Sequence, residues 1–203
     1  MQIELANFLA DFWNPFCRIL KELGWRNVSV DTSKQYAVSA LLELNKNNPV
    51  GVLFTPNGNY GKEFKEWESL EWIVTKKTDP YPPNFNALFV DLDIKQTMCK
   101  DRDELFKTTQ ETRELLGLDP TWITKKWWGP HIFWVIDPKD RIKVHELLTT
   151  KEFEQILVYL STQFIWWDAK PARMTAYMRM PNTLHWKISN IKKVWANPVS
   201  SKL

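Results

Sequence analysis

The chain has 203 residues, a net charge of +3, 44% hydrophobic residues and 25% charged residues. This length suits one compact domain with a substantial buried core, and the composition excludes a disordered, collagen-like or disulfide-rich protein. The sequence shows neither a long uninterrupted apolar segment nor a basic stretch before an apolar run at its start, so we expect no membrane span, no secretory signal and a cytoplasmic location.

The first part of the chain is predicted to mix helix and short strands. Apolar residues recur at helical spacing over residues 8–23, which predicts a helix that Pro15 kinks or splits and that Gly24 caps. The elements after it are short: strands at residues 28–30, 51–54 and 72–75, a helix at residues 38–44, and a turn-rich loop at residues 55–61.

The second part begins with a compact apolar run at residues 87–90 that ends in Asp91-Leu92-Asp93, which predicts a buried strand with two carboxylates at its C-terminal end. The later elements are a helix at residues 102–116 ended by Gly117, a hairpin of strands at residues 122–125 and 131–136, one or two helices within residues 138–164, and strands at residues 176–178 and 184–188.

This order, β-α-β-β-α-β, is typical of the RRM-like (ferredoxin-like) arrangement, in which an antiparallel sheet carries helices on one face. We therefore predict an α+β fold in which residues 1–203 form a single domain. A smaller N-terminal αβ lobe, about residues 1–83, is expected to pack beside an RRM-like lobe, about residues 84–203.

The two aspartates at the end of the apolar run are candidates for metal binding. Asp91 and Asp93 lie at positions i and i+2, so both side chains point to the same side of an extended strand. Two carboxylates this close repel each other, and a hard divalent cation relieves the repulsion by accepting their oxygens. Asp168 would complete a cluster of the kind that two-metal phosphoryl transfer uses. The alternative interpretation is that these acids are solvated charges at a strand end and a helix end.

A histidine and several cations follow the same part of the sequence. His131 opens an apolar strand, Lys187 lies in a predicted strand, and Arg173 and Arg179 precede it. Cations that converge on the carboxylate end would neutralise triphosphate oxygens. Taken one at a time, His131 is also explained as a structural histidine and each cation as a solvated charge.

Taken in order, these motifs resemble the archaeo-eukaryotic primase superfamily, especially the primase-polymerase (PrimPol) domains of plasmid and phage replication proteins. That family has an Asp-x-Asp motif at a strand end, a later short motif ending in His, and a third Asp. The corresponding segments here are FVDLD at residues 89–93, WGPHIFW at 128–134 and WWDAKPAR at 166–173. VLFTPNGNYG at residues 52–61 is similar to the family's upstream segment with a strand-end Asn, and MRMPNTLHWK at 178–187 to its Arg-x-Pro segment ending in Lys.

The resemblance implies roles for individual residues. Asp91, Asp93 and Asp168 would be the catalytic residues and the ligands of Mg²⁺ or Mn²⁺, and His131 and Lys187 would contact the incoming triphosphate. The weaker counterparts, as nucleotide or phosphate contacts, are Asn57, Arg173 and Arg179.

The resemblance also implies a function. It predicts template-directed nucleotidyl transfer by a two-metal mechanism, as a DNA primase, a DNA polymerase or both, in the replication of a plasmid, phage or mobile element. The expected partners are a single-stranded or primed DNA template, dNTP or NTP substrates, and a helicase or helical-bundle domain outside this sequence. The family commonly has Ser or Gly before the His, whereas this chain has KKWWGP at residues 125–130.

Other functions are compatible with the same residues. A non-catalytic replication protein would bind single-stranded nucleic acid without metal. A metal-dependent nuclease of the replication-initiator kind is disfavoured, because such enzymes place two His one residue apart, whereas His131, His145 and His185 stand alone. An unrelated α+β domain with scattered acids is the remaining alternative.

Overall fold

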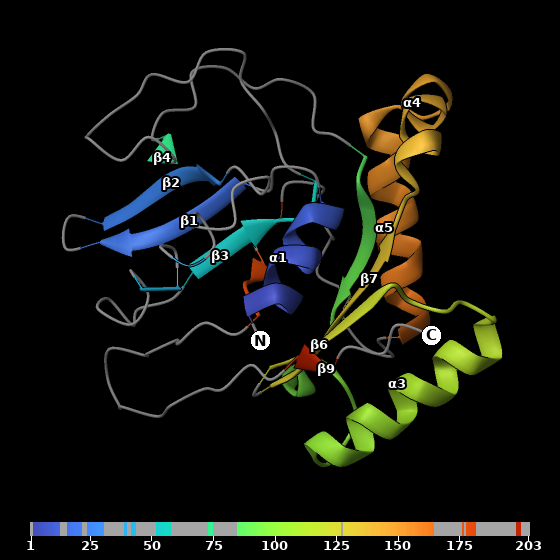
Figure 1. The fold of residues 1–203 in the computed structure, drawn as a ribbon. Coiled ribbons are helices and arrows are strands. Elements are labelled where there is room, and N and C mark those ends of the chain that lie inside the picture. The colour runs from blue at the N-terminus through green and yellow to red at the C-terminus, as the bar shows by residue number, and fades with distance from the viewer. Residues whose placement is uncertain are drawn as a thin grey trace.

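In the computed structural model, the described residues are 2–12, 16–21, 24–30, 39, 42–43, 52–57, 73–74, 85–126, 128–164, 176, 178–181 and 198–199. The protein is α+β, with small antiparallel sheets and helices, as predicted (Figure 1). None of the helices in this part of the chain combines the length and the apolar character needed to span a bilayer. The elements are α1 Gln2–Asp11, β1 Phe16–Lys21, β2 Gly24–Val30, β3 Val52–Thr55, β4 Ile73–Val74, β5 Ala87–Asp91, the 3-10 helix η1 Ile94–Gln96, α3 Arg102–Leu116, β6 Trp122–Lys126, β7 Gly129–Val135, α4 Pro138–Leu147, α5 Thr150–Phe164, β8 Met178–Arg179 and β9 Pro198–Val199.

The strands form two sheets. One has five strands in the order β4-β2-β1-β3-β8, and the other has four in the order β5-β7-β6-β9. Every pair of neighbouring strands is antiparallel. Figure 1 shows α1 between the two sheets and α5 along the opposite side of the β5 and β7 strands. The second sheet is therefore covered on both faces.

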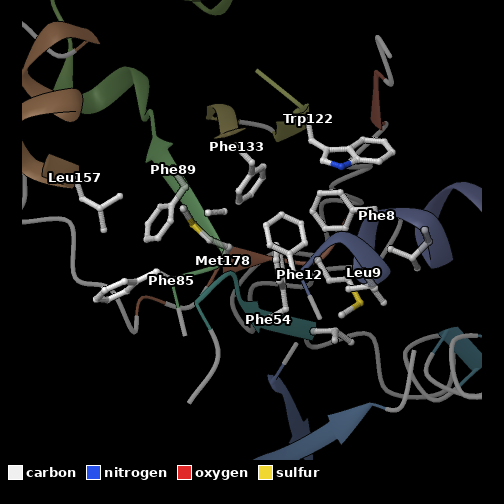
Figure 2. Close-up of a cluster of buried hydrophobic side chains, with 14 of the residues drawn as sticks. Phe8, Leu9, Phe12, Phe54, Phe85, Phe89, Trp122, Phe133, Leu157 and Met178 are labelled. Carbon is white, nitrogen blue, oxygen red and sulfur yellow. The ribbon is translucent and has the colours of Figure 1, made fainter. Parts of the chain in front are cut away.

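An aromatic core joins α1 to both sheets (Figure 2). Phe8 on α1 and Phe12, directly after its last residue, lie four positions apart. The Phe8 ring centroid is 5.2 Å from that of Phe54 in β3 and 5.6 Å from that of Phe133 in β7, and it is 5.4 Å from the Trp122 ring in β6. Tilted and edge-to-face pairs of this kind add about 0.5–1.5 kcal/mol each beyond the burial of the rings. The two sheets thus share one core through this helix.

The opposite face of the four-stranded sheet packs on α5. Val90 and Leu92 follow the alternation of an extended strand, so they point away from α1. They are fully buried in a second cluster with Ile132 of β7 and with Leu160 and Phe164 of α5. This two-sided burial holds β5 in one orientation and so determines which way its terminal aspartate faces.

The predicted helix over residues 8–23 is wrong beyond Asp11. Helix α1 ends there, residues 16–21 form β1, and Gly24 starts β2 instead of capping a helix. Proline disfavours the continuation of a helix, and β1 then pairs with β2 in a hairpin and with β3, where Phe16 lies opposite Thr55. The pairing with β3 joins segments far apart in the sequence, so the spacing of apolar residues within residues 16–23 does not predict it.

The other predictions for the first part hold where the structure describes them. The predicted strand at residues 28–30 lies within β2, and the strands at 51–54 and 72–75 correspond to β3 and β4. Residues 39, 42 and 43 are helical, within the predicted helix. Pro56 and Asn57 form a turn, and the rest of the predicted loop lies outside the described residues.

The second part follows the predicted order of elements up to α5. Helix α3 has the predicted bounds, because the Asp101 side chain accepts a hydrogen bond from Glu104 N at 2.9 Å and Gly117 ends the helix with φ 62°. The predicted hairpin is β6 and β7, and residues 138–164 contain α4 and α5. The strand predicted at residues 176–178 overlaps β8 only at Met178, and β8 pairs with β3 in the five-stranded sheet, not in the sheet of the predicted RRM-like lobe. The strand predicted at residues 184–188 lies outside the described residues.

His145 at the end of α4 is tied to the start of β5. Its Nε2 accepts a hydrogen bond from Phe85 N at 3.2 Å, and its ring stacks on the Phe85 ring with centroids 4.2 Å apart. Phe85 in turn stacks on Phe153 of α5 at 4.5 Å. Burial lowers the pKa of His145 below its ordinary value of 6.5. The neutral imidazole is therefore the form that fits the fold.

This histidine predicts a pH dependence of stability. Because folding lowers the pKa of His145, its contribution is fully present above the unfolded-state pKa of 6.5 and is lost as the pH falls through the lower folded-state value. We expect the melting temperature to fall between about pH 7.5 and about pH 5.5, and to fall less in His145→Gln. Thermal melts of both proteins across this range check the prediction, and parallel curves would contradict it.

Candidate functional site

The site begins where β5, β6 and β7 place polar residues in one cross-strand row. Asp91 lies opposite His131 in the β5–β7 pair, and His131 lies opposite Thr124 in the β6–β7 pair. Directly paired residues project from the same face of a sheet. His131 Nε2 lies 3.3 Å from Asp91 Oδ1, and the His131 side chain is only 3% exposed. The structure therefore brings together two of the predicted site residues, forty positions apart in the sequence.

A third residue, Lys126, joins this pair. It follows Thr124 by two positions on β6, so its side chain shares the face of Asp91 and His131. The Lys126 ammonium forms a close ion pair with Asp91 Oδ1. The Lys126 side chain is 9% exposed, whereas that of Asp91 is 49% exposed. The lysine thus approaches from the protein side and leaves the carboxylate partly open to solvent.

Lys126 is not among the site residues predicted from the sequence, although the alternation along its strand indicates that it is buried. Trp122, Thr124 and Lys126 alternate along β6 and are all buried. A lysine in the alternation of a buried face needs a negative partner, because a buried ammonium without one is costly. The unusual segment before the histidine therefore supplies a cation to Asp91.

The neighbours of Asp91 keep its carboxyl ionised. Burial by itself would raise the pKa of Asp91, but the hydrogen bonds from His131 and Lys126, together with the charge of Lys126, outweigh it and hold the pKa well below the ordinary value of 3.8. Burial, the Lys126 charge and the Arg179 charge lower the pKa of His131 and together outweigh the opposite effect of Asp91. We therefore assign a neutral imidazole that donates from Nε2. Its buried Nδ1 has no hydrogen-bond partner among the described residues.

Arg179 reaches the carboxylates from the other sheet. It lies on β8, which is held beside β3 by the Phe54–Met178 pair and by a hydrogen bond from Met180 N to Val52 O at 3.0 Å. Burial lowers the pKa of Arg179, and the charges of Asp91 and Asp93 act in the opposite direction. The charge of the guanidinium group therefore acts on both predicted metal ligands.

Asp93 lies just beyond the end of β5. Its backbone is extended, with φ −127° and ψ 127°, and its Oδ1 accepts a hydrogen bond from Lys95 N at 3.0 Å at the start of η1. The extended backbone continues the alternation of β5, with Leu92 buried between the two aspartates. Asp91 and Asp93 each use only Oδ1 in hydrogen bonds with described residues, so each keeps a second oxygen for a ligand.

These carboxylates fit a divalent cation. Mg²⁺ prefers oxygen ligands and is commonly held by one or two carboxylates together with substrate phosphates and waters. Asp91 and Asp93 supply the carboxylates. Among the described residues, no group of three or more His, Cys, Asp or Glu side chains is placed to hold a metal ion. The predicted third ligand Asp168 lies outside the described residues, as do Arg173 and Lys187.

The β6–β7 hairpin touches the segment that carries the aspartates. Gly129 has φ 148°, and a Cβ atom at this position would lie 2.3 Å from Leu92 O. Hydrogen bonds from Leu92 N to Pro130 O (3.0 Å) and from Ile94 N to Trp128 O (2.7 Å) extend the contact past the end of β5. The glycine allows this approach, which positions the Asp91-Leu92-Asp93 segment.

Asn57 has a structural role. It is fully buried, and its Oδ1 accepts hydrogen bonds from Asn86 N and Ala87 N, both at 2.8 Å. Its Nδ2 donates to Ala87 O at 2.8 Å. These three bonds fix the start of the strand that ends at Asp91. The nucleotide contact predicted for Asn57 stays a prediction, and the proposal below does not use it.

We expect Gly129→Ala to destabilise the protein by about 3 kcal/mol or more, because it combines an unfavourable φ with a clash against Leu92 O. Gly117→Ala is the control, because Gly117 also has a positive φ but has no atom within 4 Å of the added Cβ. It should cost only about 1 kcal/mol. Urea unfolding measures both, and equal losses would contradict the role of the close approach.

We expect Asn57→Ala to lower the free energy of unfolding by about 3 kcal/mol, because two buried backbone N–H groups lose their acceptor. The exposed Asn7 provides the control, and Asn7→Ala should change stability by less than about 0.5 kcal/mol. Chemical denaturation compares the two variants. Unchanged stability in Asn57→Ala would mean that its amide does not hold β5.

Comparisons of the chain with protein-family models, curated proteins and solved structures gave no match in any of the three. A function for this chain therefore has to be inferred from the motifs and from the geometry of the site. That geometry combines two carboxylates, a neutral imidazole and two cations at the junction of the two sheets.

Proposed function

We propose that this chain is a primase-polymerase domain of the archaeo-eukaryotic primase type, a DNA-directed nucleotidyltransferase. One observation carries the proposal: the Asp91 and Asp93 pair, His131 and Arg179 come from three separate motifs and interact in one place. The order of these motifs in the sequence carries no information about the distances between them in the fold. Their convergence is what a functional site would produce.

The arrangement of the second sheet supports the proposed RRM-like lobe. The chain runs β5-α3-β6-β7 and then into α4 and α5, and the strands lie in the order β5-β7-β6. The first three strands of a ferredoxin-like sheet have the same antiparallel order, with the first helix between strands one and two. The five-stranded sheet with α1 would be the smaller N-terminal lobe. Because one fold hosts many functions, this likeness adds support only through the site.

The proposed chemistry is nucleotidyl transfer: the hydroxyl of a primer or of a first nucleotide attacks the α-phosphate of a dNTP or NTP, and pyrophosphate leaves. Asp91, Asp93 and, from its motif, Asp168 would hold two Mg²⁺ or Mn²⁺ ions. When bound, such ions lower the pKa of the attacking hydroxyl and stabilise charge on the attacking and leaving oxygens. Arg179 would neutralise phosphate oxygens with its planar guanidinium group. His131 contacts Asp91 and would orient that carboxylate, and its contact with the incoming triphosphate stays a prediction.

The remaining predicted residues and partners belong to the same proposal. Lys187 and Arg173 would bind the triphosphate of a dNTP or NTP, as the resemblance implies. The template would be single-stranded or primed DNA, in the cytoplasmic replication of a plasmid, phage or mobile element. A helicase or helical-bundle domain would be the partner.

Extension of a labelled primer on a single-stranded template tests the proposal. With Mg²⁺ or Mn²⁺ and dNTPs or NTPs, we expect Asp91→Asn and Asp93→Asn each to lower the extension rate by roughly a hundredfold or more, because each removes a charged metal ligand. Asp119→Asn, at an exposed loop position, is the control and should keep the wild-type rate. Full extension by Asp91→Asn would rule out the proposed metal ligands.

A second candidate is the non-catalytic single-stranded DNA-binding protein. The ion pair between Lys126 and Asp91 favours it, because the carboxylate already has a cation in contact. The two functions differ in their need for metal. Template binding that persists in a metal chelator, without extension under any metal condition, would favour the binding protein.

A further inference from the structure

The backbone of Lys126 is fixed in a hairpin, and its side chain is largely buried. Its backbone is paired with Gly129 at the end of the β6–β7 hairpin, and only 9% of its side chain is exposed. Its ammonium contacts Asp91 Oδ1 and has no other partner among the described residues. A buried ammonium group needs a counter-charge, since an unpaired one costs several kcal/mol. Lys126 therefore needs the negative charge of Asp91, as a bound metal ion would.

The charges described around Asp91 already balance. Asp91 and Asp93 are negative, and Lys126 and Arg179 are positive. A divalent cation that enters this cluster adds two positive charges beside two existing cations. At a partly buried site, two like charges in contact repel by several kcal/mol. Lys126 is the residue whose charged group can move away while its backbone stays paired, because its ammonium group ends a flexible four-carbon stem.

We propose that Lys126 is the resident counter-ion of Asp91, and that a divalent cation binds to the aspartate pair by displacing the Lys126 ammonium from Oδ1. This inference rests on the metal site of the proposed function. The half-exposed side of Asp91 gives the metal ion its approach from solvent. Lys126 then sets the metal affinity, because each binding event has to overcome the ion pair.

Titration with Mn²⁺, followed by calorimetry or by the spin-resonance signal of the free ion, tests the proposal without any catalytic readout. We expect Lys126→Met, which keeps the stem and removes the charge, to bind Mn²⁺ roughly tenfold or more tightly than the wild type. Lys125→Met is the matched control: it removes the same charge from the same strand, but the Lys125 ammonium lies 5.1 Å from the Phe106 ring centroid on the other face. Its affinity should stay within about twofold of the wild type.

A second measurement uses the unaltered protein, so that it stands even if Lys126→Met fails to fold. Amine acetylation followed by mass spectrometry reports the exposure of each lysine. We expect Lys126 to react slowly without metal and several times faster with saturating Mn²⁺. Lys125 should react at the same rate in both conditions.

The outcomes separate this inference from the proposed function. Binding that Asp91→Asn abolishes but Lys126→Met leaves unchanged or weakens would overturn the displacement and keep the metal site. Unchanged acetylation of Lys126 in the Mn²⁺-bound wild type would do the same. If no variant and no wild-type protein binds Mn²⁺, both the displacement and the metal-dependent function are wrong.

Discussion

The pairing of β7 with both β5 and β6 is the constraint on which the candidate site depends. His131 lies opposite Asp91 on one side and opposite Thr124 on the other, and Lys126 follows on the same face. Because side chains alternate along a strand, a register shift of one residue would turn a polar row toward α5 and an apolar residue such as Val90 toward α1. The burial of apolar side chains on the α5 face therefore holds the polar row in place.

The second contribution to the site comes from the junction of the two sheets. Arg179 belongs to the five-stranded sheet, yet its charge interacts with the carboxylates of the four-stranded one. Strand β8 is attached to β3 opposite Phe54, whose ring packs against Phe8 and Phe12 of α1. The aromatic core that joins the sheets thus also determines how close the guanidinium group lies to the carboxylates. The packing of the aromatic core and the charge interaction of Arg179 with the carboxylates are therefore linked.

The electrostatics single out the same region. Among the described residues, the groups with clearly shifted pKa values include Asp91, His131 and Arg179, all of which lie in the site. The others, His145 and Glu152, are explained by local burial and by hydrogen bonds with Thr149. Perturbed groups gather at functional sites, although structural ion-pair networks also produce them. Asp91 is half-exposed and is paired with a buried lysine, which resembles a functional site more, because a purely structural ion pair gains nothing from being open to solvent on one side.

The sequence by itself determined the features that depend on neighbouring residues. The bounds of α3 follow from capping signals within a few positions, including Gly117, and the apolar run before Asp91 predicted β5 and its terminal carboxylates. Only the tertiary structure decided that residues 16–21 form a strand, that Lys126 is the counter-ion of Asp91, and that Asn57 holds the start of β5. Lys126 and Asn57 each take a partner at least about thirty positions away, and β1 pairs with the distant β3 as well as with the adjacent β2. Periodicity and capping act within a turn or a strand, whereas a buried polar group takes the partner that the packed fold places beside it.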